Sequence, residues 1–293
     1  IVLSALMYIG LAALLFNVLL ILAYCMERLS AVAPKRHSAA TNPSRNLEKD
    51  DTRGLNSNRF GRFASNMTVP QMMVVLLVFW SPYIIAYFPG CVYHDPADQR
   101  RQFFGAIPLS AHHPLITTYL YGGLVSLGRM LGSDTLGIFL CTIAQTAALS
   151  FACSRVISCA RSIWGSASLP VVLIPLLIFA IVPLWPSAAT SVKKDAFFYA
   201  AFSLLVVHLI EVMLVMRSGS ASKKDITCES VSIAAFSLLC ALIRNDGLIF
   251  SVFAIACMLL FVFISPGFRQ KRKALGFCTV SLLAVFSLYF VGY

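Results

Sequence analysis

The sequence has little charge, because Asp, Glu, Lys and Arg make up only 12% of its 293 residues. A soluble globular domain has about a quarter. The chain also lacks the motifs of soluble enzymes: it has no phosphate-binding glycine loop, no Gly-x-Ser-x-Gly, no His-Glu-x-x-His and no Cys-x-x-Cys. These absences exclude an ordinary soluble enzyme, and the hydrophobic share of 59% points to a membrane.

Apolar runs of transmembrane length recur along the chain, and about 20 residues suffice to cross a bilayer core. The runs are 1–26, 69–88, 135–154, 169–185, 196–216, 247–264 and 274–291, with a shorter one at 230–243. Most of the nine cysteines lie inside these runs, which predicts packed thiols rather than disulfides. We therefore expect an all-α, polytopic transmembrane helix bundle with about seven or eight spans in the plasma membrane.

The charge divides the chain into three parts. Residues 1–26 form an N-terminal transmembrane helix, and 67–293 form a multi-span domain. Between them, 27–66 is a polar linker with eight Lys and Arg and no apolar period, so we expect it to be flexible and cytoplasmic. A basic loop beside a membrane needs no nucleic-acid partner, and its contact with lipids would be nonspecific. The start at Ile1 and the end at Tyr293 favour a piece of a longer protein.

The segment 115–132 could cross the membrane or lie on its outer surface. If it does not cross, 17 of the 23 Lys and Arg lie inside and 6 outside; if it crosses, the division is 12 to 11. Positive charge stays inside, which favours the surface helix. Three polar segments, 93–114, 187–195 and 244–246, then meet at the outer face, under a long first loop.

The first polar segment contains two candidate catalytic carboxylates, Asp95 and Asp98. A carboxylate just beyond a helix end can act as a general base. Asp95 before Pro96 also fits a helix N-cap, and the two roles are compatible. His112 and His113 begin the surface helix and could orient an acceptor hydroxyl or a phosphate, or simply pack.

Two further motifs bring cations to this face. Lys193 and Lys194 stand before a helix that Asp195 would cap, and the lysines either meet an anion or anchor the helix at the interface. Arg244 needs an anionic partner, which Asp246 or a ligand phosphate would supply; the alternative is a tight turn with a local salt bridge.

Two other polar groups are candidate sites. His208 and Glu211, three apart on one helix, can touch and suit either a proton path or a helix–helix contact. The His and Asp residues of the first loop match no standard metal-ligand spacing. No metal or other cofactor is therefore predicted, although a divalent ion is compatible with these residue types.

The order of these motifs resembles a known plan. The pattern is Phe88-Pro89-Gly90, Asp95 with Gln99, His112-His113-Pro114-Leu115, Lys194-Asp195-Ala196-Phe197 and Arg244-Asn245-Asp246-Gly247. It resembles a family of uncharacterised bacterial polytopic membrane proteins, which is similar to GT-C glycosyltransferases such as protein O-mannosyltransferases and aminoarabinose transferases. The resemblance covers about 69–263, but this chain has one Asp at the first motif where those enzymes have an Asp-Glu pair.

The resemblance implies an inverting transfer of a sugar from a polyprenyl-phosphate donor to an acceptor hydroxyl of a glycan, lipid or protein. Asp95 would be the base, and Lys194 and Arg244, with Asp195 and Asn245 beside them, would receive the phosphate. Two other classes compete with this function. One is a transporter or lipid-linked glycan flippase, which His208 and Glu211 favour, and the other is a non-catalytic membrane protein.

The charge division generates a topology prediction. In a cysteine-free background, we expect a membrane-impermeant thiol reagent to label Ser110→Cys in intact cells. Ser220→Cys should react only after permeabilisation, because it follows the inner end of the 196–216 run. The reverse pattern would invert the topology and remove the outer-face site.

Overall fold

The structure is a computed structural model that describes residues 66–110, 113–164, 169–218 and 223–264. All of them belong to one compact unit, Asn56–Tyr293. The expected N-terminal helix 1–26, the linker 27–66 apart from Asn66, His112 and the apolar run 274–291 lie outside the described residues.

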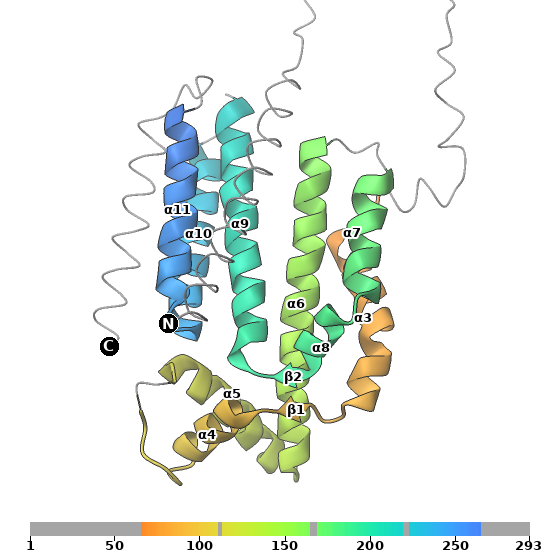
Figure 1. Ribbon diagram of the computed structural model, residues 1–293, viewed down its shortest axis with the longest axis vertical. Coiled ribbons are helices and arrows are strands. Elements are labelled where there is room, and N and C mark those ends of the chain that lie inside the picture. Colours follow the sequence, from red (N-terminus) through yellow and green to blue (C-terminus); the bar gives the residue numbers. More distant parts are fainter. Residues whose placement is uncertain (1–65, 111–112, 165–168, 219–222, 265–293) are drawn as a thin grey trace, which may run out of the picture. The chain divides into compact units, whose positions relative to one another are not determined.

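The described residues are helical apart from two two-residue strands (Figure 1). In chain order the elements are α3 (Val69–Ala86), β1 (Cys91–Val92), α4 (His94–Phe103), α5 (Leu115–Met130), α6 (Asp134–Trp164), α7 (Leu169–Ile181), α8 (Leu184–Thr190), β2 (Ser191–Val192), α9 (Lys194–Ser218), α10 (Lys223–Ile243) and α11 (Gly247–Ile264).

Helices α3, α6 and α9 are long and apolar enough to cross a membrane. The pair α7 and α8, bent by 54°, makes a fourth crossing if it counts as one broken span. The described part of the chain is thus an all-α, multi-pass bundle with three or four candidate spans, and it does not reach the expected seven or eight. The apolar parts of α10 and α11, Val231–Ile243 and Gly247–Cys257, are shorter than a full span.

The run 169–185, expected as one straight span, is broken between α7 and α8. Pro183 lies at the break and is the N-cap of α8, and Pro186 follows in its first turn. Proline has no backbone N–H and cannot continue the ladder of the preceding helix. The bend brings the chain across to β2 instead of continuing along the axis of α7.

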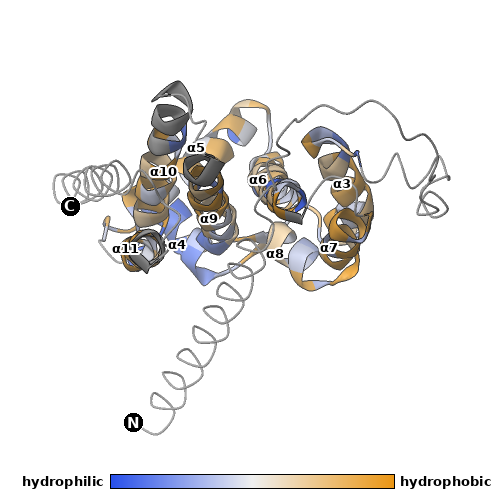
Figure 2. Ribbon diagram, turned by 90° about the horizontal axis from the view of Figure 1, so that it is seen from above, coloured by the Kyte–Doolittle hydropathy of each residue, from blue (hydrophilic) through white to orange (hydrophobic). Residues whose placement is uncertain are grey.

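Helix α6 is the centre of the bundle, because it packs against α3, α5, α7, α8 and α9. Helices α3 and α7 lie on one side of it, and α9, α10 and α11 on the other (Figures 1 and 2). The exposed side of α3 is apolar, and only 17% of its span is buried against 50% for α6. An uncovered apolar helix of this length is what a lipid-facing span requires.

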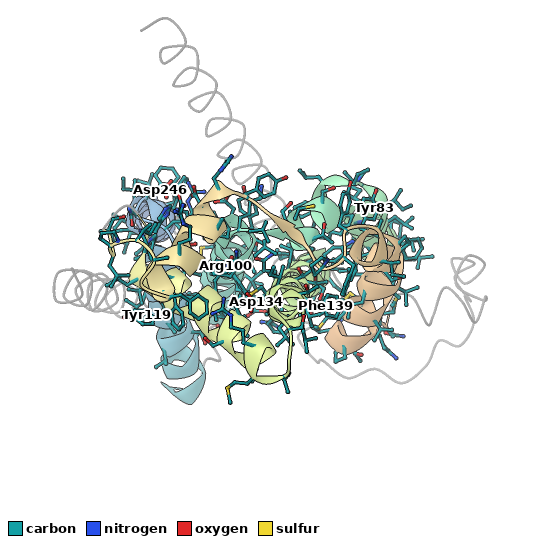
Figure 3. All side chains as sticks on the ribbon, turned by 90° about the horizontal axis from the view of Figure 1, so that it is seen from below. Tyr83, Arg100, Tyr119, Asp134, Phe139 and Asp246 are labelled. Atoms are coloured by element: carbon teal, nitrogen blue, oxygen red, sulfur yellow. The ribbon has the colours of Figure 1, made fainter. Side chains whose placement is uncertain are left out.

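The short helices α4 and α5 lie at the lower end of the bundle in Figure 1, and α4 is the hydrophilic one in Figure 2. Figure 3 shows this end from below, with Arg100, Tyr119 and Asp134 on it. Helix α5 has 16 residues, begins after Pro114 and is not among the candidate spans. The surface position expected for the helix at 115–132 stays a prediction.

The strands β1 and β2 join the two halves of this end. They pair in parallel, with Cys91 opposite Ser191 and Val92 opposite Val192. Gly90, at φ +135°, precedes β1, and a Cβ there would clash with the side chains of Thr142 and Val192. Glycine is required at this position for both its backbone conformation and the close approach of β1 to α6.

Gln145 of α6 holds β2 and the start of α9 in place. Its Nε2 donates to the backbone oxygen of Ser191 at 2.8 Å. Its Oε1 accepts from Tyr121 Oη at 3.0 Å and from the backbone N–H of Lys193 at 3.1 Å. Because Gln145 is fully buried, these bonds connect α5, α6 and α9 where no water competes.

We expect Gln145→Met to lower the free energy of unfolding by about 2 kcal/mol or more, since it leaves the Tyr121 hydroxyl and the Lys193 N–H without their buried acceptor. Thermal unfolding of the detergent-purified protein measures the change. Ile143→Leu, at an exposed apolar position of the same helix, should leave the transition unchanged. An equal transition for Gln145→Met and the wild type would show that this amide does not hold the lower end together.

Candidate functional site at the lower end of the bundle

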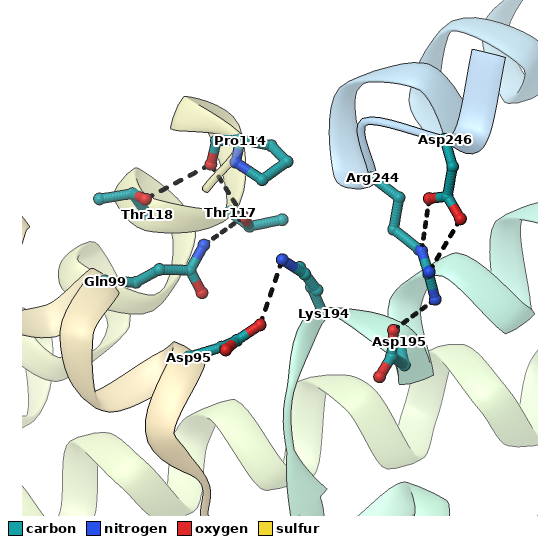
Figure 4. A network of polar contacts seen from close by, with 9 residues as sticks. All are labelled: Asp95, Gln99, Pro114, Thr117, Thr118, Lys194, Asp195, Arg244 and Asp246. Carbon is teal, nitrogen blue, oxygen red and sulfur yellow. Dashed lines mark hydrogen bonds and ion pairs between the residues drawn. The ribbon is translucent and has the colours of Figure 1, made fainter. Parts of the chain in front are cut away.

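The three polar segments of the sequence meet at the lower end through consecutive residues of α9 (Figure 4). Lys194 Nζ lies 3.3 Å from Asp95 Oδ2 of α4. The next residue, Asp195, accepts from Arg244 Nη1 at 2.7 Å. The first turn of α9 therefore links the first loop to the turn between α10 and α11, and we call these residues the lower-end site.

Asp95 is positioned differently from the expectation. Helix α3 ends at Ala86, and Asp95 follows only after β1, in the first turn of α4. The N-cap of α4 is Tyr93, so the prediction that Asp95 caps a helix starting at Pro96 is wrong. The pairing of β1 with β2 sets where α4 begins. In the first turn, the carboxylate of Asp95 is still stabilised by the positive end of the helix dipole.

The two lysines before α9 are directed to different partners. Lys194 lies against Asp95, whereas Lys193 Nζ lies 4.9 Å from the centroid of the Tyr93 ring, a cation–π distance. Helix α9 starts at Lys194, so Asp195 lies in the first turn and is not the cap. Of these two lysines, Lys194 is therefore the one in contact with the candidate catalytic carboxylate Asp95.

Arg244 lies in a tight turn and has two carboxylate partners. Its guanidinium donates to both oxygens of Asp246, at 2.8 and 2.9 Å, and to Asp195. The hydrogen bond to Asp246 raises the pKa of Arg244 above its ordinary value, and the charge of Asp195 adds to the effect. Arg244 therefore has the anionic partner that was expected, Asp246. The tight turn with a local salt bridge, which was the alternative, is the same interaction. Asn245 lies in the same turn.

Gly247 begins α11 directly after this turn. A Cβ at Gly247 would clash with the backbone oxygen of Cys240 in α10, so glycine lets the two helices approach each other closely. The Arg-Asn-Asp-Gly motif therefore combines a helix junction with a fixed guanidinium.

The second candidate carboxylate, Asp98, lies apart from the ion pair of Asp95. Its partner is Arg101, at 3.5 Å, and both side chains are largely exposed. The cation in contact with Asp95 is instead Lys194. An exposed pair of this kind contributes little to stability.

His113 is buried at the entry to α5. Beside it, Pro114 ends the loop, and its backbone oxygen accepts from the hydroxyl of Thr117 at 2.9 Å. Thr117 in turn accepts from Gln99 Nε2 at 2.6 Å, which ties α4 to α5. Gln99 entered the sequence analysis only as part of a motif, and the structure gives it this direct link to the start of α5.

A second polar cluster lies within the bundle, between α6, α9 and α10. His208 Nδ1 lies 2.7 Å from Glu229 and 3.5 Å from Glu211, which confirms the expected contact between His208 and Glu211. Arg155 donates to both oxygens of Glu211, at 2.8 and 3.0 Å. The sequence analysis missed Glu229 and Arg155, because only packing of α6 and α10 against α9 brings them close.

This inner cluster is the group among the described residues that could hold a metal ion. The ligand atoms of His208, Glu211 and Glu229 all lie within 4.8 Å of one another. Imidazole and carboxylate are ligands for several divalent metals. Arg155 already neutralises Glu211, so one of the two carboxylates has its counter-ion without a metal.

The chemistry available at the lower end follows from exposure and charge. The side chain of Asp95 is 50% exposed and that of Lys194 only 17%, so the carboxylate faces water while the ammonium is held in the structure. Lys193, Lys194 and Arg244 balance Asp95, Asp195 and Asp246 in formal charge. The site can accept an anion if that anion replaces a carboxylate at a cation, and Asp95 is the carboxylate with room to move.

Comparison with known proteins gives one family and no relative of established function. No curated protein and no solved structure matches the chain. A model for a family of unknown function, DUF6020, matches residues 105–290, which is more than half of the chain and includes Lys194, Asp195 and the Arg-Asn-Asp-Gly turn. The match begins after Asp95 and Gln99, so it does not include the first-loop carboxylates. The chain belongs to the DUF6020 family.

Proposed function

We propose that the protein is an integral membrane glycosyltransferase that moves a sugar from a polyprenyl-phosphate donor to an acceptor hydroxyl at the outer face. The observation that carries the proposal is the 3.3 Å ion pair between Asp95 and Lys194. In this pair, Asp95 is a carboxylate that faces water and can act as a base, and Lys194 is a cation that can bind a phosphate. Both lie at one end of an apolar bundle. A donor whose lipid stays in the bilayer presents its phosphate at such an end.

The ion pair supplies a way to couple donor binding to base activation. A donor phosphate carries charge that competes with Asp95 for the Lys194 ammonium. When Lys194 turns to the phosphate, Asp95 loses its ion-pair partner, and its oxygens are free to accept the proton of the acceptor hydroxyl. The donor thereby prepares the carboxylate that its own reaction requires.

The reaction then balances as a single displacement. Asp95 takes the proton of the acceptor hydroxyl while the hydroxyl oxygen attacks the anomeric carbon. The bond from that carbon to the phosphate oxygen breaks, and its electron pair leaves with the polyprenyl phosphate. Lys194 stabilises the charge that develops there, and attack from the opposite side inverts the anomeric configuration.

Arg244 has a supporting role in this scheme. It is held by Asp195 and Asp246, so it fixes the first turn of α9 and contributes positive charge at the site without losing a partner. Lys194 is therefore the residue proposed to contact the phosphate first. The order of motifs along the chain, which resembles GT-C enzymes, supports a phosphate near both Lys194 and Arg244.

We expect Asp95→Asn to lower sugar transfer by about 10²–10⁴-fold, because it removes the base and keeps the shape. The measurement is turnover of polyprenyl-phosphate sugars by the full chain in nanodiscs. Asp98→Asn, three residues further in the same helix, should retain near-full transfer. If Asp98→Asn is the inactive variant, the base is Asp98; if both transfer normally, the mechanism is wrong.

A transporter or lipid-linked glycan flippase is the second candidate, and the inner cluster of His208, Glu211, Glu229 and Arg155 favours it. Ionisable groups within a bundle are costly unless they are paired, and they mark ion or proton paths in transporters. His208 is 14 residues from Lys194 along α9, or about 21 Å at 1.5 Å per residue. The two polar groups are thus separate sites.

His208→Gln separates the two functions. For the glycosyltransferase, we expect transfer to stay within about twofold of the wild type, because the substitution removes no group of the lower-end site. For a proton-coupled carrier, the same change removes a titrating group and abolishes uptake driven by a pH gradient in proteoliposomes. If the wild type shows uptake driven by a pH gradient and His208→Gln abolishes it, the carrier replaces the glycosyltransferase as the proposed function.

A further inference from the structure

The orientation of the Gln99 amide follows from the hydrogen bonds of its neighbour. A threonine hydroxyl has one proton to donate. Thr117 gives that proton to the backbone oxygen of Pro114, at 2.9 Å. It can therefore only accept from Gln99, at 2.6 Å, so Gln99 must present its NH₂ group to Thr117 and direct its oxygen the other way.

The oxygen of this amide is buried without a donor. Gln99 is 0% exposed, and its Oε1 has no hydrogen-bond partner among the residues that the structure describes. Figure 4 shows this oxygen on the side of Asp95 and Lys194, away from Thr117. Gln145, the other fully buried glutamine of this end, has partners for both of its amide atoms. Buried acceptors in native proteins are nearly always paired, so an unpaired one beside a charged pair points to a ligand.

We infer that Gln99 Oε1 accepts a hydrogen bond from a ring hydroxyl of the donor sugar, so that the site distinguishes sugars with this hydroxyl from deoxy sugars. The inference rests on the proposed function and adds a specificity-determining residue to it.

The chemistry of the reaction selects the donor sugar over the acceptor. The acceptor hydroxyl gives its single proton to Asp95, so it has none left for Gln99. A ring hydroxyl of the donor keeps its proton throughout the displacement. It also lies on the same sugar whose phosphate contacts Lys194, next to Asp95. Gln99 is thus placed to hold the sugar ring while its anomeric carbon is attacked.

The test measures binding without any acceptor, on the full chain in nanodiscs. The probes are farnesyl-phosphate monosaccharides of glucose, mannose, galactose and N-acetylglucosamine, each with analogues that lack one ring hydroxyl. We expect the wild type to bind one deoxy analogue about tenfold or more weakly than its parent, because a buried polar group is left unpaired. Gln99→Met, which removes the acceptor oxygen, should bind that analogue and the parent equally.

Two variants control for folding and position. Gln99→Glu keeps an acceptor oxygen and should retain discrimination, even if Gln99→Met unfolds. Gln102→Met makes the same substitution three residues further along α4. The oxygen of that amide is also buried without a partner among the described residues, while its NH₂ group donates to Ser110. If the contact to the sugar belongs to Gln99, Gln102→Met should discriminate like the wild type, and loss of discrimination in this variant would move the contact to Gln102.

The outcomes separate the two proposals. Equal binding of every deoxy analogue by the wild type, discrimination that persists in Gln99→Met, or loss of discrimination in Gln99→Glu would overturn the role of Gln99 and leave sugar transfer standing. Discrimination that appears only when an acceptor is added would show that the contact to the donor hydroxyl does not form in the donor complex, and would also overturn the inference. If the wild type binds none of the farnesyl-phosphate sugars, the proposed function itself fails.

Discussion

The lower-end site depends on one buried amide, that of Gln145. A glutamine in an apolar bundle is costly unless both of its polar atoms are paired, and here each has a partner on a different element. The bond to the N–H of Lys193 fixes the residue just before α9, so the directions of Lys194 and Asp195 follow from it. Because α6 packs against α3, α5, α7, α8 and α9, the site is tied to the central helix of the bundle rather than to a loop.

Ion pairing at this end keeps the charges available to a ligand. Lys194 and Arg244 would be costly in a bilayer without partners, and three carboxylates remove that cost before any substrate arrives. The pairs differ in what they allow. Arg244 is held by two carboxylates and stays in place, whereas Lys194 has one partner, Asp95, whose side chain is half exposed. An arriving anion can therefore exchange with Asp95 far more readily than with Asp195 or Asp246.

The sequence predicted what depends on local pattern and missed what depends on packing. Apolar runs located α3, α6, α9, α10 and α11, and the charge division predicted that the three polar segments share one end. The cap at Asp95 was wrong because the start of α4 is set by β1 pairing with β2, about 100 residues away, and not by the Asp-Pro dipeptide. The orphan oxygen of Gln99 depends on tertiary contacts that a hydropathy pattern does not contain. The break at Pro183 follows from a local proline, which a hydropathy average over the run 169–185 does not register.

The two polar clusters differ in a way that bears on which of them carries out chemistry. In the inner cluster, Arg155 pairs with Glu211, His208 pairs with Glu229, and each carboxylate has a partner on another helix. Such a network can be stable with no ligand, as a contact between spans. At the lower end, Gln99 leaves a buried oxygen unpaired and Asp95 faces water, through which a proton can leave. A substrate could pair with the buried oxygen of Gln99 and replace the ion pair of Asp95 with Lys194. Of the two clusters, the lower-end site is the one that offers both.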